Sequence, residues 1–391
     1  MRQRCRRIAT EGFNVCGPTV PATQRNRENM DFSYGSSILS HQHPVDAALL
    51  RATTDKMTKE PAVSVVIATR DRPASLARLL QCVKRQDLQE IECIVVDDGS
   101  TDETIAAYDG IRRELDERFD IHVQPPGSRR VGGPSRARNR GIRAARGEFI
   151  AFCDDDDIWV RDDHLRVAFH SLKQQGGDFF FGNLQTSRGG HVIGPDFYGA
   201  ARGPLMRHPI AGESDIFEVS RTDRARSMKQ VFLHCDSIVV SRALLLDCGL
   251  FWEKLSMAED RDLGLRLLDR AEKVLYRSTV VADYDRTGLV GICHSYTEDE
   301  IRQFVVLAMM HAETQMQDVS LRRVARGYRS WMLVELAQGA LEAGRPDQAR
   351  ELAIQSFFLR PTSAAVSLVV RTIFRPRHAA ALRLGDRTQV N

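Results

Sequence analysis

The sequence predicts an α/β protein, in which an open sheet is flanked by helices and followed by an all-helical C-terminal extension. Two observations carry this expectation. From residue 62 to about residue 157, short β-branched runs alternate with segments of helical period, as in a parallel sheet covered on both faces. After Thr297 the periodicity is helical to about Phe374.

The first elements follow one another in a regular order. Four buried strands are expected at residues 63–69, 91–96, 121–123 and 148–153. The helices between them are expected to start at Pro73, at the cap residues Thr101 and Asp102, and at Gly132. The second of these helices is expected to end near Arg118.

Residues 178–284 are less regular. Short strands are expected at 179–184, 237–240, 273–276 and 280–284, and helices near 242–248 and 261–270. Further on, residues 331–361 resemble one tetratricopeptide-type hairpin, which cannot form a solenoid alone and is expected to pack against the α/β part. We therefore divide the chain into a poorly ordered leader (1–60), an α/β domain (61–296) and a helical extension (297–391).

Composition excludes several classes of protein. The 391 residues suffice for two or three domains with cores of their own. The 55 Lys and Arg against 52 Asp and Glu leave a net charge of +3, too small by itself to indicate a nucleic-acid partner. No apolar run approaches the ~18–20 residues that span a bilayer. The scattered cysteines fit no zinc spacing and suggest free thiols, so we expect a cytoplasmic protein.

Four consecutive aspartates, residues 154–157, directly follow the predicted strand 148–153. Their mutual repulsion raises their pKa values unless a cation balances them. Carboxylates at the edge of a sheet suit Mg²⁺ or Mn²⁺, which take oxygen ligands and keep positions open for substrate phosphates. The alternative is a solvated acidic loop, but the buried strand before the aspartates favours a metal site.

Three other segments place polar groups beside strand or helix ends. VVDDGSTD (95–102) puts carboxylates where they could accept hydrogen bonds from a base or ribose, although a turn with a helix cap explains it equally well. GGPSRARNRG (132–141) combines a helix start with arginines, which suits a diphosphate; a basic helix face is the alternative. Glu259 and Asp260 precede an amphipathic helix, where a carboxylate acts as a general base or only as a cap.

In this order, the four segments resemble the family 2 glycosyltransferases of the GT-A fold, over roughly residues 62–294. VSVVIATRDRP resembles the strand that contacts the nucleotide, VVDDGSTD the base-binding segment, SRARNRGIRAARGEFIAFCDDDDIW the Arg-Asn helix with the acidic metal motif, and AED the segment of the catalytic base. The resemblance implies a GT-A nucleotide-binding sheet. It also implies metal-dependent transfer of a sugar, with inversion, from a nucleotide-sugar (a UDP-sugar foremost) to an acceptor hydroxyl, as in cell-envelope polysaccharide synthesis. The implied cofactor is Mn²⁺ or Mg²⁺.

The resemblance also implies roles for single residues. Asp260 is the expected catalytic base, with Glu259 as second choice. The expected metal ligands are Asp156 and Asp154 of the Asp-x-Asp motif, together with His294, which stands near the position of a late histidine in relatives. The residues expected to bind the nucleotide-sugar are Thr69, Arg70, Arg72, Asp97, Asp98, Arg138, Asp154 and Asp155. Arg70-Asp71-Arg72 departs from the Asn-Arg pair that relatives usually carry, and the run of aspartates leaves the register of the metal motif uncertain by one.

Two other functions stay open. Nucleotidyl transfer onto a sugar phosphate also uses an α/β sheet and Mg²⁺, but it would want a glycine-rich basic loop after the first strand. A catalytically inactive transferase fold serving as a scaffold is the non-enzymatic alternative. The acceptor is expected to be a glycan, a lipid-linked molecule or a small molecule. The six arginines and one aspartate of residues 360–387 predict either weak peripheral contact with the inner face of a membrane or a solvated helix.

Overall fold

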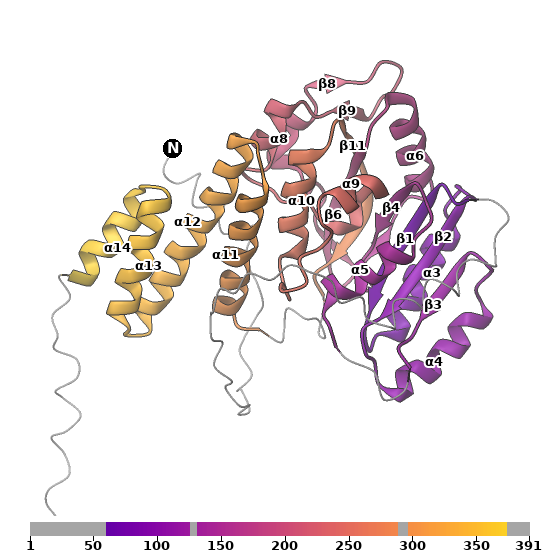
Figure 1. The fold of residues 1–391 in the computed structure, drawn as a ribbon, viewed down its shortest axis with the longest axis horizontal. Coiled ribbons are helices and arrows are strands. Elements are labelled where there is room, and N and C mark those ends of the chain that lie inside the picture. Colours follow the sequence, from indigo (N-terminus) through magenta and orange to yellow (C-terminus); the bar gives the residue numbers. More distant parts are fainter. Residues whose placement is uncertain (1–59, 126–130, 288–295, 374–391) are drawn as a thin grey trace, which may run out of the picture.

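The computed structural model describes residues 60–125, 131–287 and 296–373. The expectations for the leader, for His294 and for the basic end from residue 374 onwards concern residues outside these ranges. Figure 1 shows a sheet covered by helices at one end of the molecule and a row of further helices that extends away from it.

The described strands form one mixed sheet of eleven strands, in which the main path runs β3-β2-β1-β4-β10-β6-β11-β9-β8. Two strands lie off this path, since β5 pairs with β11 and β7 with β6. The strands are β1 (Val63–Thr69), β2 (Ile91–Asp97), β3 (Phe119–His122), β4 (Phe149–Phe152), β5 (Ile158–Trp159), β6 (Phe179–Arg188), β7 (His191–Gly194), β8 (His208–Pro209), β9 (Ile216–Glu218), β10 (Ile238–Ser241) and β11 (Val274–Asp285).

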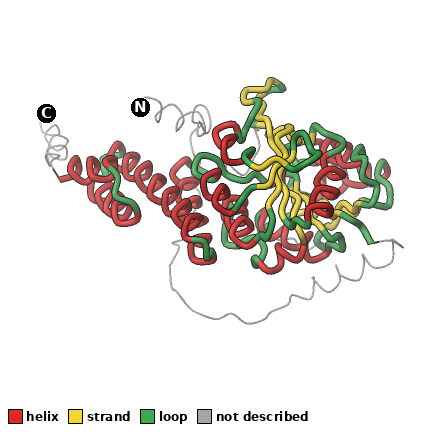
Figure 2. The backbone as a smooth tube through the Cα atoms, turned by 90° about the horizontal axis from the view of Figure 1, so that it is seen from above, coloured by secondary structure: helices red, strands yellow, loops and turns green. Residues whose placement is uncertain are grey.

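Helices lie on both sides of the sheet, as the view from above shows (Figure 2). Those of the α/β part are α3 (Pro73–Lys84), α4 (Asp102–Arg113), α5 (Pro134–Ala144), α6 (His164–Gln175), α7 (Arg202–Leu205), α8 (Arg221–Ser227), α9 (Arg242–Asp247) and α10 (Glu259–Arg270), with the 3₁₀ turns η1 (Gly199–Ala201) and η2 (Cys235–Ser237). The α/β class and the flanking helices expected from the sequence are confirmed.

The first four strands of the path are parallel and bring three polar segments to one edge of the sheet. β1 pairs with both β2 and β4, and Thr69 lies opposite Asp97 in the register with β2. The chain runs from β1 through β2 and β3 to one side and returns to β4 on the other side of β1. Such a reversal of strand order opens the crevice where ligands bind in open α/β sheets.

The second half of the sheet is mixed, contrary to the expectation for an open parallel sheet, although β11 is parallel to β6. β10 is antiparallel to both neighbours, β4 and β6, and β9 is antiparallel to β11. Because β10 runs against β4, its first residues lie at the edge where β4 ends. His234, Cys235 and Asp236, which precede β10, therefore lie beside the aspartates that follow β4.

Several element boundaries also differ from the expectation; α10, for example, begins at Glu259 and so includes Asp260. α4 ends at Arg113 and not near Arg118, because the chain must turn before β3 begins at Phe119. The strands expected at 273–276 and 280–284 are one strand, β11, whose pairing with β6 shifts register between Arg277 and Val280. A bulge explains why the sequence pattern breaks there although the strand continues.

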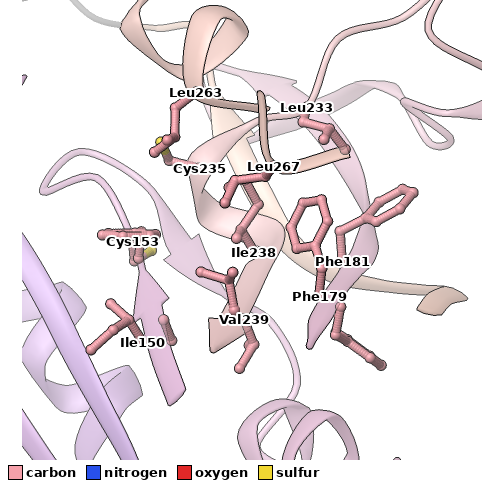
Figure 3. Close-up of a cluster of buried hydrophobic side chains, with 14 of the residues drawn as sticks. Ile150, Cys153, Phe179, Phe181, Leu233, Cys235, Ile238, Val239, Leu263 and Leu267 are labelled. Carbon is pink, nitrogen blue, oxygen red and sulfur yellow. The ribbon is translucent and has the colours of Figure 1, made fainter. Parts of the chain in front are cut away.

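A core of apolar side chains fixes α10 over the middle of the sheet (Figure 3). Phe179 and Phe181 of β6, Val239 of β10, and Leu263 and Leu267 of α10 are all at most 2% exposed. The two leucines are four residues apart and so lie on one face of α10. This packing places the first turn of α10, which carries Glu259 and Asp260, beside the end of β4 and the start of β10.

The C-terminal helices are α11 (Glu298–Gln315), α12 (Val319–Glu342), α13 (Pro346–Leu359) and α14 (Ser363–Ile373). α11 begins with a capping box between Thr297 and Glu300 and packs against α10. α12 and α13 form a hairpin joined by a short turn, with the Ser330 and Ser356 hydroxyls 2.9 Å apart. In Figure 1, α14 lies farthest from the sheet. None of the helices in the described ranges is both long enough and apolar enough to cross a bilayer.

Candidate active site

A network of ion pairs joins the ends of β1 and β4. Thr69 Oγ1 donates a hydrogen bond to Asp155 Oδ2 at 2.7 Å, and the Arg72 guanidinium donates to Asp155 Oδ1 at 2.6 Å. Arg72 also lies 2.8 Å from Asp156 Oδ2. Burial raises the pKa of Asp155, and it raises the pKa of Asp156 to about 6, in both cases against the opposing effect of Arg72.

Arg138 of α5 connects the aspartate run to α10. Its Nη1 donates to Glu259 Oε1 at 2.7 Å, and its Nη2 donates to Asp154 Oδ1. The guanidinium group is buried and lies over the ring of Phe251, 5.3 Å from its centroid. One planar, doubly paired cation thus fixes the distance between the end of β4 and the start of α10.

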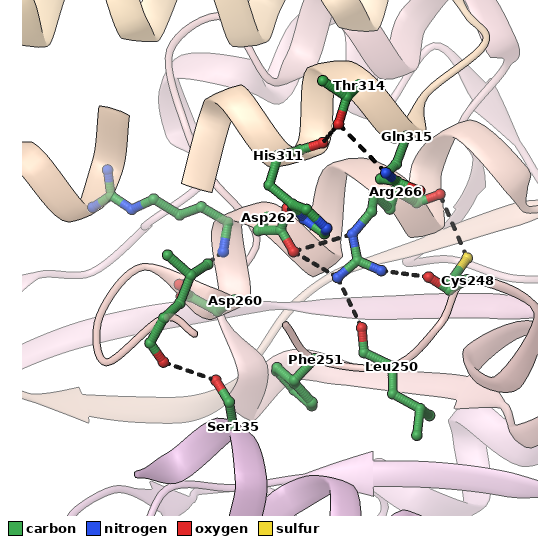
Figure 4. Close-up of polar contacts among 12 residues, drawn as sticks. Ser135, Cys248, Leu250, Phe251, Asp260, Asp262, Arg266, His311, Thr314 and Gln315 are labelled. Carbon is green, nitrogen blue, oxygen red and sulfur yellow. Dashed lines mark hydrogen bonds and ion pairs between the residues drawn. The ribbon is translucent and has the colours of Figure 1, made fainter. Parts of the chain in front are cut away.

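The rest of α5 holds the loop that leads into α10. Ser135 Oγ donates to the backbone oxygen of Leu255 at 3.1 Å (Figure 4). Asn139 accepts a hydrogen bond from the Phe251 backbone N–H at 3.0 Å and donates one to its carbonyl at 2.9 Å. Ser135 and Asn139, one helical turn apart on a buried face of α5, thus anchor residues 251–255, and Arg138 beside them reaches Asp154 and Glu259.

At the start of α10 the two carboxylates have different partners. Ala258 adopts the left-handed conformation, with a φ of 62°, and so turns the chain sharply into the helix. Glu259 is bound by Arg138, whereas Asp260 Oδ1 accepts the backbone N–H of Arg261 at 2.8 Å. Burial raises the pKa of Asp260, against the opposing charges of His234 and Arg261. Asp260 is therefore a carboxylate of raised pKa whose Oδ1 accepts a backbone N–H, whereas the Arg138 guanidinium binds Glu259.

The first turn of α10 is also anchored from behind, by the C-terminal helices (Figure 4). Asp262 is fully buried and accepts two hydrogen bonds from Arg266, which itself donates to the carbonyl oxygens of Cys248 and Leu250. On its other side, Asp262 Oδ1 lies 2.7 Å from His311 Nδ1 of α11. The His311 ring stacks on Trp252, with centroids 4.2 Å apart.

Beside the aspartate run lies a buried group of two aspartates and a histidine. Asp236 Oδ1 accepts the backbone N–H of Asp154 at 2.7 Å, and Asp236 Oδ2 lies 3.1 Å from His234 Nδ1. Burial, and then the charge of Asp236, raise the pKa of Asp157 well above its usual range. Burial alone would lower the pKa of His234, but the Asp236 carboxylate outweighs it and raises that pKa to about 9.

The donor atoms of this region fit a divalent cation. One ligand atom each from Asp154, Asp157 and His234 lie within 4.8 Å of one another. Two carboxylates and one imidazole suit Mn²⁺ or Mg²⁺ better than a soft metal. A cation would also displace the proton that the high pKa of His234 retains, since metal ligation requires the neutral imidazole.

The other residues assigned to the nucleotide lie on the β2 side. Both oxygens of Asp98 accept backbone N–H groups, from Gly132 and Gly133 at 2.8 Å, and burial raises its pKa. Asp97 is fully buried; it accepts hydrogen bonds from the Tyr108 hydroxyl and from the backbone of Gly99 and Ser100. Arg70 is half exposed, and its Nε lies 3.6 Å from Asp71 Oδ2.

The structure thus gathers most of the residues singled out in the sequence, but groups them differently. Asp154, Asp155, Arg138, Glu259 and Asp260 lie at one edge, whereas Asp156 pairs with Arg72 and lies outside the candidate metal cluster. Asp157 belongs to the run of aspartates for which the sequence predicts a metal site but had no role of its own there, and His234 and Asp236 had none at all. The signal was present as His234-Cys235-Asp236 directly before a buried strand, but only the antiparallel pairing of β10 brings these residues to this edge.

Comparisons with known proteins agree with this geometry. Residues 64–223 match the model of the family described as glycosyl transferase family 2. A PGL/p-HBAD biosynthesis glycosyltransferase of Mycobacterium bovis is 31% identical over 242 residues, which cover 61% of this chain and 82% of that protein.

A second relative is the GalNAc(5)-diNAcBac-PP-undecaprenol beta-1,3-glucosyltransferase of Campylobacter jejuni, 29% identical over 135 residues, or 34% of this chain. The chain spans only 41% of the length of that protein and 45% of the glycosyltransferase GlyG of Streptococcus pneumoniae. Among solved structures, S. aureus TarS 1-349 in complex with UDP-GlcNAc superposes with a TM-score of 0.56 at 17% identity, over 79% of this chain and 88% of that one. This likeness concerns the fold.

The bridge through Arg138 gives a testable expectation for stability. Arg138→Met leaves the buried Glu259 carboxylate without its cation and should lower the free energy of unfolding by about 3–5 kcal/mol. Adding Glu259→Gln should restore a large part of this loss, because no buried charge is then unpaired. Urea unfolding of the wild type, both single variants and the double variant, in EDTA at pH 7.5, measures the coupling. A double variant no more stable than Arg138→Met contradicts the bridge.

Proposed function

Because the chain belongs to glycosyl transferase family 2, we propose that it transfers a sugar from a nucleotide-sugar to an acceptor hydroxyl. The observation that supports this best is the meeting of three features at one edge of the sheet. These are the buried polar ends of β1 and β2, a cluster of side chains suited to a divalent cation, and Asp260 with its raised pKa. In this proposal the strand ends bind the nucleotide, the cation stabilises the leaving group, and Asp260 acts on the acceptor.

For the donor we propose a UDP-sugar, bound across the ends of β1, β2 and β4. Thr69, Asp98 and Asp155 are placed to contact base and ribose there, with Asp97 holding the turn behind them. Arg70 and Arg72 border the same crevice. The arginines and the start of α5 at Gly133 supply the positive charge that a diphosphate requires.

Asp154, Asp157 and His234 are proposed to hold a divalent cation, with Asp156 as a further carboxylate within the same loop. When bound, the ion neutralises the negative charge that develops on the departing diphosphate. In its absence, the carboxylates of this loop are balanced by Arg72, Arg138 and His234.

Asp260 is the proposed general base. The acceptor oxygen attacks the anomeric carbon, its proton passes to an Asp260 carboxylate oxygen, and the bond from the anomeric carbon to the diphosphate oxygen breaks, with inversion. A pKa raised by burial brings a carboxylate closer to the pH at which a base works best. Glu259 positions this turn, because Arg138 occupies it.

The alternatives receive less support. Nucleotidyl transfer would want a glycine-rich loop after β1, where the chain instead has Arg70-Asp71-Arg72. A purely scaffolding role would require none of the buried charges that the site maintains, although burying them is costly.

We further propose weak contact between the last helices and an anionic membrane surface, which would suit a lipid-linked acceptor. Phe358 of α13 is 80% exposed, and Val366, Val370 and Ile373 of α14 are each about half exposed. Arg371 lies on α14, and residues 374–391 add Arg375, Arg377, Arg383 and Arg387. Apolar side chains beside clustered arginines suit an interface of anionic lipids.

Nucleotide binding should depend on the metal. In a thermal-shift panel of UDP, GDP, dTDP and CMP, we expect one nucleotide to stabilise the protein only with Mn²⁺, by about 2.7 kcal/mol at 100 times its dissociation constant. Asp157→Asn and His234→Ala should each lose most of this Mn²⁺-dependent stabilisation. Asp247→Asn, at an exposed position, should keep it. If Asp156→Asn alone lost the shift, Asp156 would be the metal ligand in place of Asp157 and His234. No shift with any nucleotide would contradict the proposed function.

Asp260→Asn should lower sugar transfer about 10²–10⁴-fold, because an amide cannot accept the acceptor proton. Its affinity for UDP with Mn²⁺ should stay close to that of the wild type. Release of UDP from UDP-sugars in the presence of acceptor measures transfer, and calorimetry measures affinity. Full transfer activity in Asp260→Asn would remove the residue from the role of base.

Membrane contact should be visible in co-sedimentation with vesicles. Phe358→Ser together with Val370→Ser should lower binding to vesicles of phosphatidylglycerol and phosphatidylcholine at low salt, while Leu246→Ser, on the exposed side of α9, should not. Raised salt should weaken wild-type binding as it screens the arginines. Equal binding by all three proteins, or none by the wild type, would contradict the contact.

A further inference from the structure

Three aromatic rings from distant parts of the chain surround His234. Tyr284 of β11 lies 4.5 Å from the His234 ring, Phe232 lies 6.2 Å from it, and Phe197 lies 6.3 Å from it, all between centroids. Phe197 and Phe232 also contact each other edge to face at 5.4 Å. His234 is buried, whereas the three surrounding rings stay partly exposed. Aromatic rings left open at a site that also holds charged groups are common in ligand sites.

This aromatic group lies directly beside the proposed chemistry. The guanidinium of Arg261, the residue after Asp260, lies over the Phe232 ring, 3.9 Å from its centroid. His234 itself belongs to the cluster with Asp154 and Asp157. A molecule resting on Phe232 and Tyr284 would therefore lie next to both the general base and the leaving group.

The aromatic group is also on the correct side of the sheet for a second substrate. The residues proposed for the nucleotide follow β1, β2 and β4, whereas Tyr284 lies on β11 and Phe197 follows β7. In the strand order, β10 and β6 separate the two sets. The donor therefore does not need the surface formed by the aromatic rings.

The segment that carries Phe232 is held in place by the C-terminal helices. The Tyr328 hydroxyl of α12 donates to the backbone oxygen of Val231 at 3.1 Å. Behind Phe232 and Arg261 lies a small apolar cavity, lined in addition by Met309 of α11 and Tyr328. The Phe232 ring thus lines this cavity and stays partly exposed.

We propose that Phe232, Tyr284 and Arg261 form an acceptor subsite that binds a pyranose ring of a glycan, and this rests on the proposed function. The C–H face of a pyranose packs against aromatic rings, while its hydroxyl groups need hydrogen-bond partners, which the five N–H donors of an arginine supply. A purely apolar acceptor would not need a guanidinium beside the ring. The subsite orients one sugar hydroxyl toward Asp260.

Saturation-transfer NMR on the full chain, with UDP and Mn²⁺ present, tests this with methyl pyranosides of glucose, galactose, mannose and N-acetylgalactosamine. We expect at least one to receive saturation, strongest at its ring C–H protons. Phe232→Ala and Tyr284→Ala should each weaken its affinity about tenfold, which corresponds to about 1.4 kcal/mol of stacking. Phe232→Trp should retain it, which separates loss of stacking from loss of structure.

The matched control is Phe357→Ala, an exposed ring on α13, which should leave pyranoside binding unchanged. The subsite is wrong if no pyranoside binds the wild type, if Phe232→Ala and Tyr284→Ala bind as the wild type does, or if cyclohexanol binds in place of the sugars. The affinity for UDP separates a failure of the subsite from a failure of the proposed function. A wild type that binds pyranosides but no nucleotide refutes the proposed function and not the sugar site, and loss of UDP binding in Phe232→Ala assigns the ring to the donor and overturns the subsite.

Discussion

The site depends on one buried cation. Arg138 joins the aspartate run after β4 to the first turn of α10 through two carboxylates, Asp154 and Glu259. Three elements from different parts of the chain are thereby fixed at one point. The buried carboxylates are paired with a cation, which offsets the cost of burying them. Without this cation, the carboxylates would repel one another where the aspartate run meets the start of α10.

The same bridge decides which carboxylate is available. Glu259 and Asp260 are neighbours, and the sequence alone leaves either of them as the base. Because Arg138 binds Glu259, that side chain has a structural partner, whereas Asp260 keeps a raised pKa and accepts the backbone N–H of Arg261. A difference in partners, more than a difference in chemical type, separates the positioning residue from the proposed base.

The sequence was sufficient for the parallel half of the fold and insufficient for the other half. Val63–Thr69 and residues 91–96 are apolar and β-branched, so local pattern and tertiary environment agree there. β10 has the same local pattern, and nothing in it indicates that it runs antiparallel to β4. That single reversal brings His234 and Asp236 to the site, so these residues could not be assigned. Asp156 stays a predicted metal ligand, and its pairing with Arg72 could not be foreseen, because that contact depends on the position of α3.

The contact between His311 and the catalytic half has a consequence for how such proteins diverge. His311 stacks on Trp252 and lies against Asp262, two residues beyond the proposed base, although it belongs to a helix of the C-terminal extension. The extension therefore helps to hold the catalytic half in place, and an exchange of the extension alone between family members would break these contacts. We therefore expect substitutions at Trp252, Asp262 and His311 to be coupled, because a change at any one of them alters the contacts of the other two.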